Sequence, residues 1–283
     1  SPHQNSANAR LTCITAGRIF RQDSKRRKST MDLSTLSVGQ YDFIANAFSF
    51  GFAVMAAATL FLWFSRSQVA PAYKMAVTIS GLVTAIAGYH YLQIMLSWDA
   101  AFSVTNGTIE TTGYAFNQAY RYVDWLLTVP LLLVELILVM RLSRSETVSK
   151  SVTLGGAAAL MIILGYPGEV AEGGATRFLF WVLSMIPFIY IVYQLVVGLK
   201  GSISKQPENV RGLINGAATL VVVSWLFYPI VFLFPLIGLT GGAAITAVEV
   251  GYTVADIVAK AVFGILILMI AMRKSEAEGK ASA

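Results

Sequence analysis

The sequence is poor in the residues that build metal centres, disulfide frameworks and charged surfaces. Its 283 residues include one cysteine, Cys13, and two histidines, His3 and His90. One cysteine excludes a disulfide framework and a cysteine cluster, and histidines so far apart do not indicate a paired metal site, so we predict no metal. Charged residues make up 13% of the chain and hydrophobic residues 56%, more than a soluble domain can bury. The composition is typical of a membrane protein.

The sequence also lacks the phosphate-binding pattern Gly-x4-Gly-Lys-Ser/Thr, so it does not indicate nucleotide hydrolysis as an energy source. Its net charge of +6 does not indicate a nucleic-acid partner, because seven of the 21 basic residues fall within the first 28 positions. We interpret residues 1–40 as a basic, disordered leader, residues 41–275 as a membrane domain and residues 276–283 as a cytoplasmic tail. An organelle transit segment, or an extension upstream of a true start at Met31, are the alternatives for the leader.

Seven apolar stretches follow the leader, separated by short polar breaks. Each approaches the about 20 residues with which a helix crosses about 30 Å of hydrocarbon. The sequence therefore predicts an all-α bundle of seven transmembrane helices. We place the spans at residues 43–64, 76–98, 119–140, 152–167, 178–199, 212–236 and 245–272.

The connections between the spans predict the orientation, because the cytoplasmic side of a membrane protein carries an excess of lysine and arginine. The breaks after the first, third and fifth spans, together with the chain after the seventh, hold eleven basic residues, whereas the opposite loops hold only Arg177. We expect the N-terminus of the bundle outside and its C-terminus in the cytoplasm. In one outside loop Asn106-Gly107-Thr108 matches a glycosylation sequon, which is a weak signal.

Lys260 lies inside the last apolar stretch, where an ammonium costs about 2.5–3.5 kcal/mol to insert and is usually functional. Asp256 lies one helical turn earlier on the same face. The two residues could form a structural ion pair. The alternative is a desolvated amine that forms a Schiff base with a carbonyl compound, with Asp256 as part of the counter-ion. We expect Lys260 to be the one lysine within a span.

The third span carries a row of polar residues along one helix face. Arg121, Asp124 and Thr128 are spaced by three and four residues, and Glu135 returns to that face about 16 Å further along. Carboxyl groups in the middle of a membrane helix indicate a proton relay. In the second span, a lone histidine such as His90 is more often a packing residue, but next to Asp124 it would tune when that carboxylate accepts a proton.

Two motifs resemble those of the microbial rhodopsins, and most closely the proteorhodopsin and xanthorhodopsin branch. They are Arg121-Tyr-Val-Asp-Trp-Leu-Leu-Thr-Val-Pro-Leu-Leu in the third span and Asp256-Ile-Val-Ala-Lys260 in the seventh, and Trp225-Leu-Phe-Tyr228-Pro229 in the sixth span matches the family's pocket wall. The resemblance covers about residues 40–275, which include all seven spans.

The resemblance implies all-trans retinal bound covalently through Lys260. It makes Asp124 the counter-ion and proton acceptor, Asp256 the second counter-ion, Arg121 the organiser of the exit side, and His90 the residue that holds the acceptor. The pocket that it implies for retinal is formed by Trp125, Leu132, Met161, Gly165, Ser184, Trp225, Tyr228, Pro229 and Tyr252.

The resemblance also implies the activity, because this family sorts its functions by the positions of Asp124, Thr128 and Glu135. An Asp-Thr-Glu set resembles outward proton pumps, with Glu135 as the proton donor, whereas sodium pumps carry Asn-Asp-Gln and sensory members usually lack the donor carboxyl. We expect a light-driven outward proton pump, which is an ion transporter and not an enzyme. The alternatives are a sensory photoreceptor with the same pocket, a light-gated channel and, if the resemblance were accidental, a colourless secondary transporter.

Finer expectations follow from single positions and from the family. Leu132 stands where the green-absorbing members of the family carry leucine, so we expect green absorption.

Some xanthorhodopsin relatives bind a carotenoid at a window left by a glycine. In this sequence Trp181, one turn before Ser184, stands at that position, so we expect no carotenoid antenna. Relatives often form pentamers or hexamers, so we expect a homo-oligomer in the lipid bilayer, in a microbial plasma membrane or an internal membrane of a eukaryote.

Overall fold

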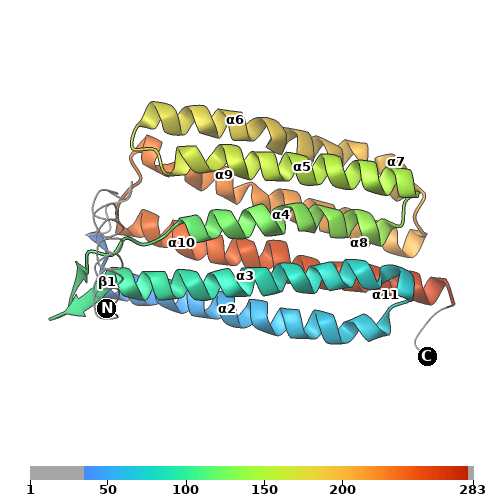
Figure 1. Cartoon of the computed structure of the whole chain (residues 1–283), viewed down its shortest axis with the longest axis horizontal. Helices are drawn as coiled ribbons and strands as arrows, with labels where there is room; N and C mark the ends of the chain where they lie inside the picture. The colour runs from blue at the N-terminus through green and yellow to red at the C-terminus, as the bar shows by residue number, and fades with distance from the viewer. Residues whose placement is uncertain (1–34, 280–283) are drawn as a thin grey trace, which may run out of the picture.

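The chain folds into a bundle of seven transmembrane helices that run side by side, as the computed structural model shows for residues 35–279 (Figure 1). Residues 1–34, which hold most of the expected leader, lie outside the described residues. The seven spans are Val38–Gln68, Lys74–Ala101, Ala119–Met140, Arg144–Glu169, Gly174–Ser204, Glu208–Phe232 and Gly242–Ala277. This confirms the predicted bundle, and each predicted span lies in one of these helices, except that the sixth helix ends at Phe232 and not at residue 236.

Several of the helices contain an irregular segment. The unbroken ones are α2 (Val38–Ser65), α3 (Lys74–Ala101), α4 (Ala119–Met140) and α5 (Arg144–Glu169). The fifth span joins α6 (Gly174–Tyr193), a π-helical segment (Gln194–Gly198) and α7 (Lys200–Ser204), and the sixth joins α8 (Glu208–Trp225) and α9 (Phe227–Phe232). The seventh joins α10 (Gly242–Asp256), a π-helical segment (Ile257–Val262) and α11 (Phe263–Ala277). Short 3-10 turns lie at Arg66–Gln68, Pro71–Tyr73 and Phe234–Ile237.

Polar caps extend some helices beyond the apolar stretches. Ser37 and Gln40 form a reciprocal capping box, so α2 begins at Val38, inside the range 1–40 that we assigned to the leader. Ser143 accepts a hydrogen bond from the backbone of Glu146, so α5 begins at Arg144 instead of residue 152. The fourth span is therefore not the short one that its hydropathy indicated. A helix continues past the hydrocarbon wherever its first turn finds a cap.

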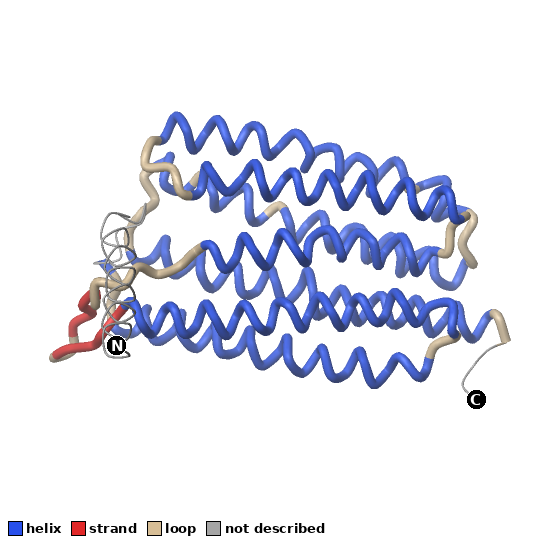
Figure 2. The backbone as a smooth tube through the Cα atoms, in the orientation of Figure 1, coloured by secondary structure: helices blue, strands red, loops and turns tan. Residues whose placement is uncertain are grey.

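A two-stranded hairpin between α3 and α4 departs from the predicted all-α fold (Figure 2). Its antiparallel strands are β1 (Phe102–Thr105) and β2 (Thr108–Thr111). Between them Asn106 and Gly107 have φ values of 51° and 78°, which suit a two-residue hairpin turn and explain the Asn-Gly pair without glycosylation. The hairpin lies at the end of the bundle where α2 begins, whereas α11 ends at the opposite end (Figure 1).

Two helices lie deepest in the bundle. Of the most apolar part of α4, and likewise of the seventh span, 61% is buried inside the protein, against 17% for α5. The seventh span changes to π-helical hydrogen bonding around Lys260. Single-turn π-helical segments of this kind are often found at functional sites. The sixth span breaks at Leu226, since Pro229 has no N–H to give to the carbonyl of Trp225. Both irregularities face the site described next.

Candidate functional site

Lys260 forms a buried triad with two carboxylates. It is 1% exposed, and its Nζ pairs with Asp124 Oδ2 from α4 and lies 3.1 Å from Asp256 Oδ1, one turn away on its own helix. The spacing of Lys260 and Asp256 in the sequence predicted the second contact. The first arises because α4 and the seventh span share the centre of the bundle. A buried ammonium between two carboxylates is neutralised, which is what such a burial requires.

Asp256 is held by three hydrogen-bond donors besides the lysine. Tyr228 OH donates to its Oδ1 at 2.6 Å, Tyr91 OH to its Oδ2 at 2.9 Å and Trp125 Nε1 to its Oδ1 at 3.3 Å. The pocket motif pointed to Tyr228 and Trp125, whereas Tyr91 was not among the predicted site residues. With both oxygens occupied, Asp256 is a fixed negative charge.

Asp124 is held more loosely. Its Oδ2 faces Lys260, but its Oδ1 is buried without a hydrogen-bond partner in the described part of the chain. The expected His90–Asp124 pair is a contact of 3.8 Å between Nδ1 and Oδ1, longer than a hydrogen bond, and the same Nδ1 lies 2.9 Å from the carbonyl oxygen of Ile86. Thr128 does not touch the carboxylate either, since its hydroxyl donates to the Asp124 backbone carbonyl at 2.8 Å. Asp124 therefore retains a free oxygen that can take a proton.

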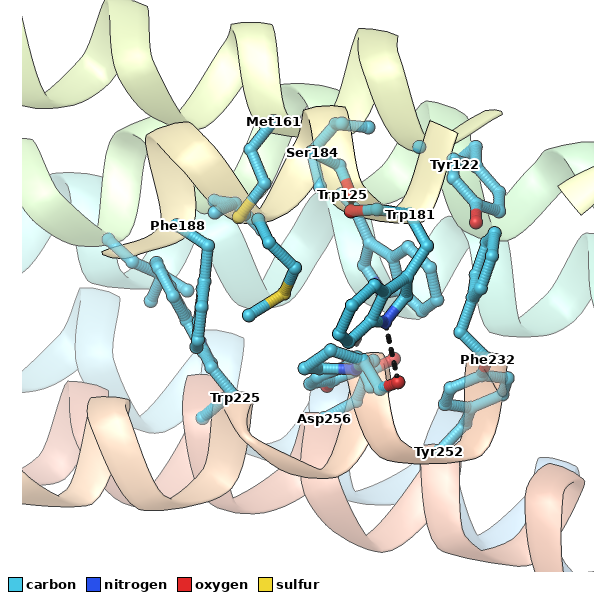
Figure 3. Close-up of a pocket in the computed structure, with 18 of the residues that line it drawn as sticks. Tyr122, Trp125, Met161, Trp181, Ser184, Phe188, Trp225, Phe232, Tyr252 and Asp256 are labelled. Atoms are coloured by element: carbon cyan, nitrogen blue, oxygen red, sulfur yellow. Dashed lines mark hydrogen bonds between the residues drawn. The ribbon is translucent and has the colours of Figure 1, made fainter. Parts of the chain in front are cut away.

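An apolar cavity extends from Lys260 between α4, α5, α6 and the sixth and seventh spans (Figure 3). All the residues expected to contact the chromophore line it: Trp125, Leu132, Met161, Gly165, Ser184, Trp225, Tyr228, Pro229, Tyr252 and Lys260 itself. The sequence did not single out Tyr122, Met185, Phe188 and Phe232, which line the cavity too. Aromatic and sulfur-containing side chains around one amine fit a long apolar molecule attached at that amine, and the orphaned oxygen of Asp124 fits a polar group there.

Trp181 closes the cavity on the side of α6. Its indole Nε1 donates to the backbone carbonyl of Pro229 at 2.9 Å, a bond that links α6 to α9 (Figure 3). One turn further, the Ser184 hydroxyl donates to the Trp181 carbonyl at 2.9 Å and so fixes this part of the wall. The carbonyl of Pro229 is in turn free for this bond because the helix is broken nearby.

Glu135 is fully buried on α4, on the face of Asp124 and toward the end of the bundle where α11 ends. Ser80 from α3 donates to its Oε2 at 2.5 Å, and its Oε1 has no hydrogen-bond partner within residues 35–279. No basic side chain within that range pairs with it. The row of carboxyls predicted from the spacing is thus present, with one member in the triad and one apart from it. Ser80 was missed, because nothing in the sequence pairs α3 with α4 at that depth.

Arg121 lies on the opposite side of the triad from Glu135 and forms a buried ion pair with Glu249 of α10. Gln118 Nε2 donates to the other Glu249 oxygen at 2.8 Å. The guanidinium also lies over the rings of Phe48 and Tyr252, 5.3 and 5.0 Å from their centroids. Glu249 was not among the predicted residues, although it lies two turns before Asp256 on the same helix. That spacing was a usable signal.

A second lysine is buried in the seventh span, contrary to our expectation for Lys260. Lys274 is 5% exposed, and its Nζ donates to the carbonyls of Val139 and Met140, each at 3.0 Å, and to Gln206 Oε1 at 2.7 Å. The sequence misled us because the helix continues to Ala277, five residues beyond the predicted end of the span. Within residues 35–279, no group of three His, Cys, Asp or Glu side chains is placed to hold a metal.

The comparisons with known proteins agree with this arrangement. The family model described as "Bacteriorhodopsin-like protein" matches residues 42–274. A blue-light absorbing proteorhodopsin of Gamma-proteobacterium Hot 75m4 is 32% identical over 224 residues, 78% of this chain and 83% of the relative. The crystal structure of xanthorhodopsin, described as a light-driven ion pump with dual chromophore, superposes with a TM-score of 0.84 at 48% identity, over 88% of this chain and 99% of that one. The crystal structure of a thermophilic rhodopsin superposes with a TM-score of 0.85 at 43% identity, over 88% of this chain and 100% of that one.

Proposed function

Because the chain belongs to the family of bacteriorhodopsin-like proteins, we propose that it is a light-driven outward proton pump that binds all-trans retinal covalently through Lys260 Nζ. One observation carries the proposal beyond the family. The two carboxylates at Lys260 differ, since both oxygens of Asp256 accept hydrogen bonds and Asp124 keeps an unpaired oxygen. A third carboxyl group, that of Glu135, lies apart from them, toward the end of the bundle where α11 ends. Such an arrangement gives a proton one direction in which to move.

Retinal would supply absorption of visible light and a change of shape at the lysine nitrogen. Trp125, Trp225, Tyr228 and Tyr252 would hold it from the sides, and Met161, Gly165, Ser184 and Pro229 would complete the enclosure. Leu132 lines this cavity, and because leucine here resembles the green-absorbing members, we expect green absorption. An absorption maximum in the blue would contradict that expectation.

The chain's own residues provide a proton path along α4. Asp124 accepts the proton of Lys260 Nζ, which its Oδ2 already contacts, and its free Oδ1 lies within 3.8 Å of His90. On the exit side, the Arg121–Glu249 pair is positioned to respond when the charge on Asp124 is lost. Glu135 then returns a proton to the lysine nitrogen from the far side, with Ser80 orienting its carboxyl group. Acceptor and donor on opposite sides of the nitrogen make the transfer vectorial.

We place the end of the bundle that holds Glu135 and the C-terminus of α11 in the cytoplasm, as the excess of basic residues there indicates. The protein would then lie in the plasma membrane of a microbe and move protons outward across it. A homo-oligomer fits the family. Xanthorhodopsin, to which the chain is similar, is described as a light-driven ion pump, in keeping with this setting.

The second chromophore of xanthorhodopsin does not extend to this chain in our proposal. Trp181 occupies the wall where an antenna would need an opening, and its bond to the Pro229 carbonyl would have to break to admit one. Mixing the purified protein with hydroxylated carotenoids and recording the excitation spectrum checks this. We expect no energy transfer to retinal, and a carotenoid band in that spectrum would overturn the assignment of Trp181.

The pump is tested by illuminating cells that make the protein with retinal and following the pH of an unbuffered suspension. We expect acidification that an uncoupler abolishes and that Asp124→Asn lacks, because an amide cannot take the proton that the carboxylate accepts. A sensory photoreceptor would leave the pH unchanged despite a normal visible spectrum. A light-gated channel would give a passive current that reverses with the applied voltage.

A further inference from the structure

A polar cavity of about 500 Å³ opens at the end of the bundle where α11 ends. The turn before α3, the end of α4, the connection from α7 to α8 and the end of α11 surround it. Arg141, Lys205 and Glu278 form its exposed rim, and the buried side chains of Tyr73, Met140, Gln206 and Lys274 form its floor. A rim in solvent and a polar floor make this cavity a vestibule for water.

Lys274 holds the floor together. All three of its N–H groups are used, on the carbonyls of Val139 and Met140 and on the side chain of Gln206. The two carbonyls belong to the last turn of α4, where a helix has no partners of its own for them. One ammonium thus ties α11 to the end of α4 and to the connection that leads into the sixth span.

The floor separates the vestibule from Glu135. Val139 lies one turn beyond Glu135 on α4, about 6 Å along the helix axis. Leu136 and Val139 on α4, with Ile270 and Ala271 one turn before Lys274 on α11, are each fully buried. A proton that travels from the vestibule to Glu135 therefore has to pass the ammonium and then a buried apolar layer.

Three of the elements around the cavity place a charge near this ammonium, and the turn before α3 adds the neutral Tyr73. Arg141 and Lys205 add two positive charges at the rim, and Glu278 adds one negative charge that Arg141 already binds, at 3.3 and 3.4 Å, and that also accepts from Tyr73 OH. Lys274 also lies 5.3 Å from the centroid of the Tyr73 ring. Arg141 and Glu278 bind and offset one another, so the ammonium of Lys274 itself makes the floor positive, which opposes the entry of a proton.

We propose that Lys274 is the gate for proton uptake by Glu135, a positioning residue that closes the vestibule floor and sets the rate at which Glu135 is refilled from the cytoplasm. The inference rests on the proposed function, in which Glu135 is the donor. Removing the ammonium breaks the hydrogen bonds that link α11 to the end of α4, and it also lowers the positive charge at the floor. Both effects act in the same direction, toward faster proton entry.

The test replaces Lys274 by methionine, which has a similar length and no charge. We expect proton uptake after a flash, followed with a pH-indicator dye, to become about tenfold faster near neutral pH and to accelerate further as the pH falls. Lys274→Arg should restore the slow uptake. Gln206→Leu removes one acceptor of Lys274 but keeps the charge of its ammonium, so proton uptake should accelerate less in this variant than in Lys274→Met. The exposed Lys200 at the same end gives the control Lys200→Met, which should change nothing.

A measurement in the dark separates this inference from pumping. The carboxyl stretch of Glu135 in the infrared, identified with Glu135→Gln, shifts when the protein is moved into D2O, and the rate of this shift should rise in Lys274→Met. Faster exchange in a protein that does not pump would leave the gate in place and overturn the proposed function. Unchanged or slower exchange and uptake in a Lys274→Met protein that melts at the wild-type temperature would overturn the gate.

Discussion

Two lysines are buried on the seventh span, and they differ in the kind of partner that each one has. Lys260 faces the carboxylates of Asp124 and Asp256, whereas Lys274 faces two backbone carbonyls and the amide oxygen of Gln206. A carboxylate can receive the proton of an ammonium, but a carbonyl or amide oxygen can only orient it. Burial alone therefore does not mark the reactive lysine. The chemistry of its neighbours does.

The comparison also separates the two ends of the proton path. Around Lys260 two carboxylates face one ammonium, and one oxygen of Asp124 remains unpaired, so a proton can move. Around Lys274 every N–H has an acceptor, and no acid among residues 35–279 forms an ion pair with the ammonium, so its position is fixed. Lys260 is therefore arranged to give up its proton, whereas Lys274 is arranged to keep its proton.

The largest effect is expected from exchanging each lysine for alanine. Lys260→Ala should abolish visible absorption after addition of retinal, because no other amine lines the apolar cavity in the described part of the chain. Lys274→Ala should remain coloured, because its nitrogen lies at the far end of α11 among carbonyls. Spectra before and after treatment with hydroxylamine measure both. A coloured Lys260→Ala protein would end the assignment of the attachment site.

The next effect concerns the isolated carboxyl. Glu135→Gln keeps the shape of the side chain and an acceptor for Ser80 but removes the transferable proton. We expect recovery of the absorption after a flash to slow by about a hundredfold, as loss of an acid catalyst commonly does, while the colour stays the same. Flash photolysis at several pH values measures it, and Ser80→Ala is the control for altered geometry. Recovery at the wild-type rate would mean that Glu135 is not the donor.

The sequence predicted the parts of this site that lie on one helix. The spacing of Asp256 and Lys260, and of Asp124 and Glu135, follows from helical geometry, and apolar length predicted the seven spans. The motif resemblance supplied the pocket residues, all of which line one cavity. What a single helix determines could be read directly from the order of residues.

The contacts between helices could not be predicted in this way. Ser80 on Glu135, Tyr91 on Asp256 and Glu249 on Arg121 each join residues far apart in the chain, and their pairing depends on how the helices pack. Lys274 was missed for another reason. Its ammonium donates to a backbone carbonyl at the end of α4 and to the side chain of Gln206 in the connection after α7. These acceptors allow a charged residue to be buried beyond the apolar stretch.

Another buried cation, Arg177, combines the two kinds of partner and sharpens the comparison. It pairs with Glu169 Oε2 at 3.1 Å and donates to the carbonyls of Phe232, at 2.9 Å, and Glu169, at 3.2 Å. Removing one member of a buried ion pair costs about 3–5 kcal/mol. Arg177→Met should therefore lower the temperature at which the colour is lost by about 10 °C without moving the absorption maximum. A midpoint within a degree of the wild type would show that neither the ion pair with Glu169 nor the bonds to the two carbonyls stabilise the protein measurably.

The smallest effect is expected at the rim of the vestibule, where Tyr73 donates to Glu278 beneath Arg141. Burial, and then the hydrogen bond to Glu278, raise the pKa of Tyr73 to about 12, from about 10 in an unfolded chain. The folded protein thus holds this proton more tightly than the unfolded one, so its stabilising effect is complete below pH 10 and disappears as the pH rises through 12. Tyr73→Phe should cost less than about 1 kcal/mol near pH 8, as partly exposed charge networks do. Thermal midpoints of Tyr73→Phe and wild type should differ by about 1–3 °C at pH 8 and converge as the pH approaches 12, and a difference that grows with pH would show that the hydroxyl is not held by Glu278.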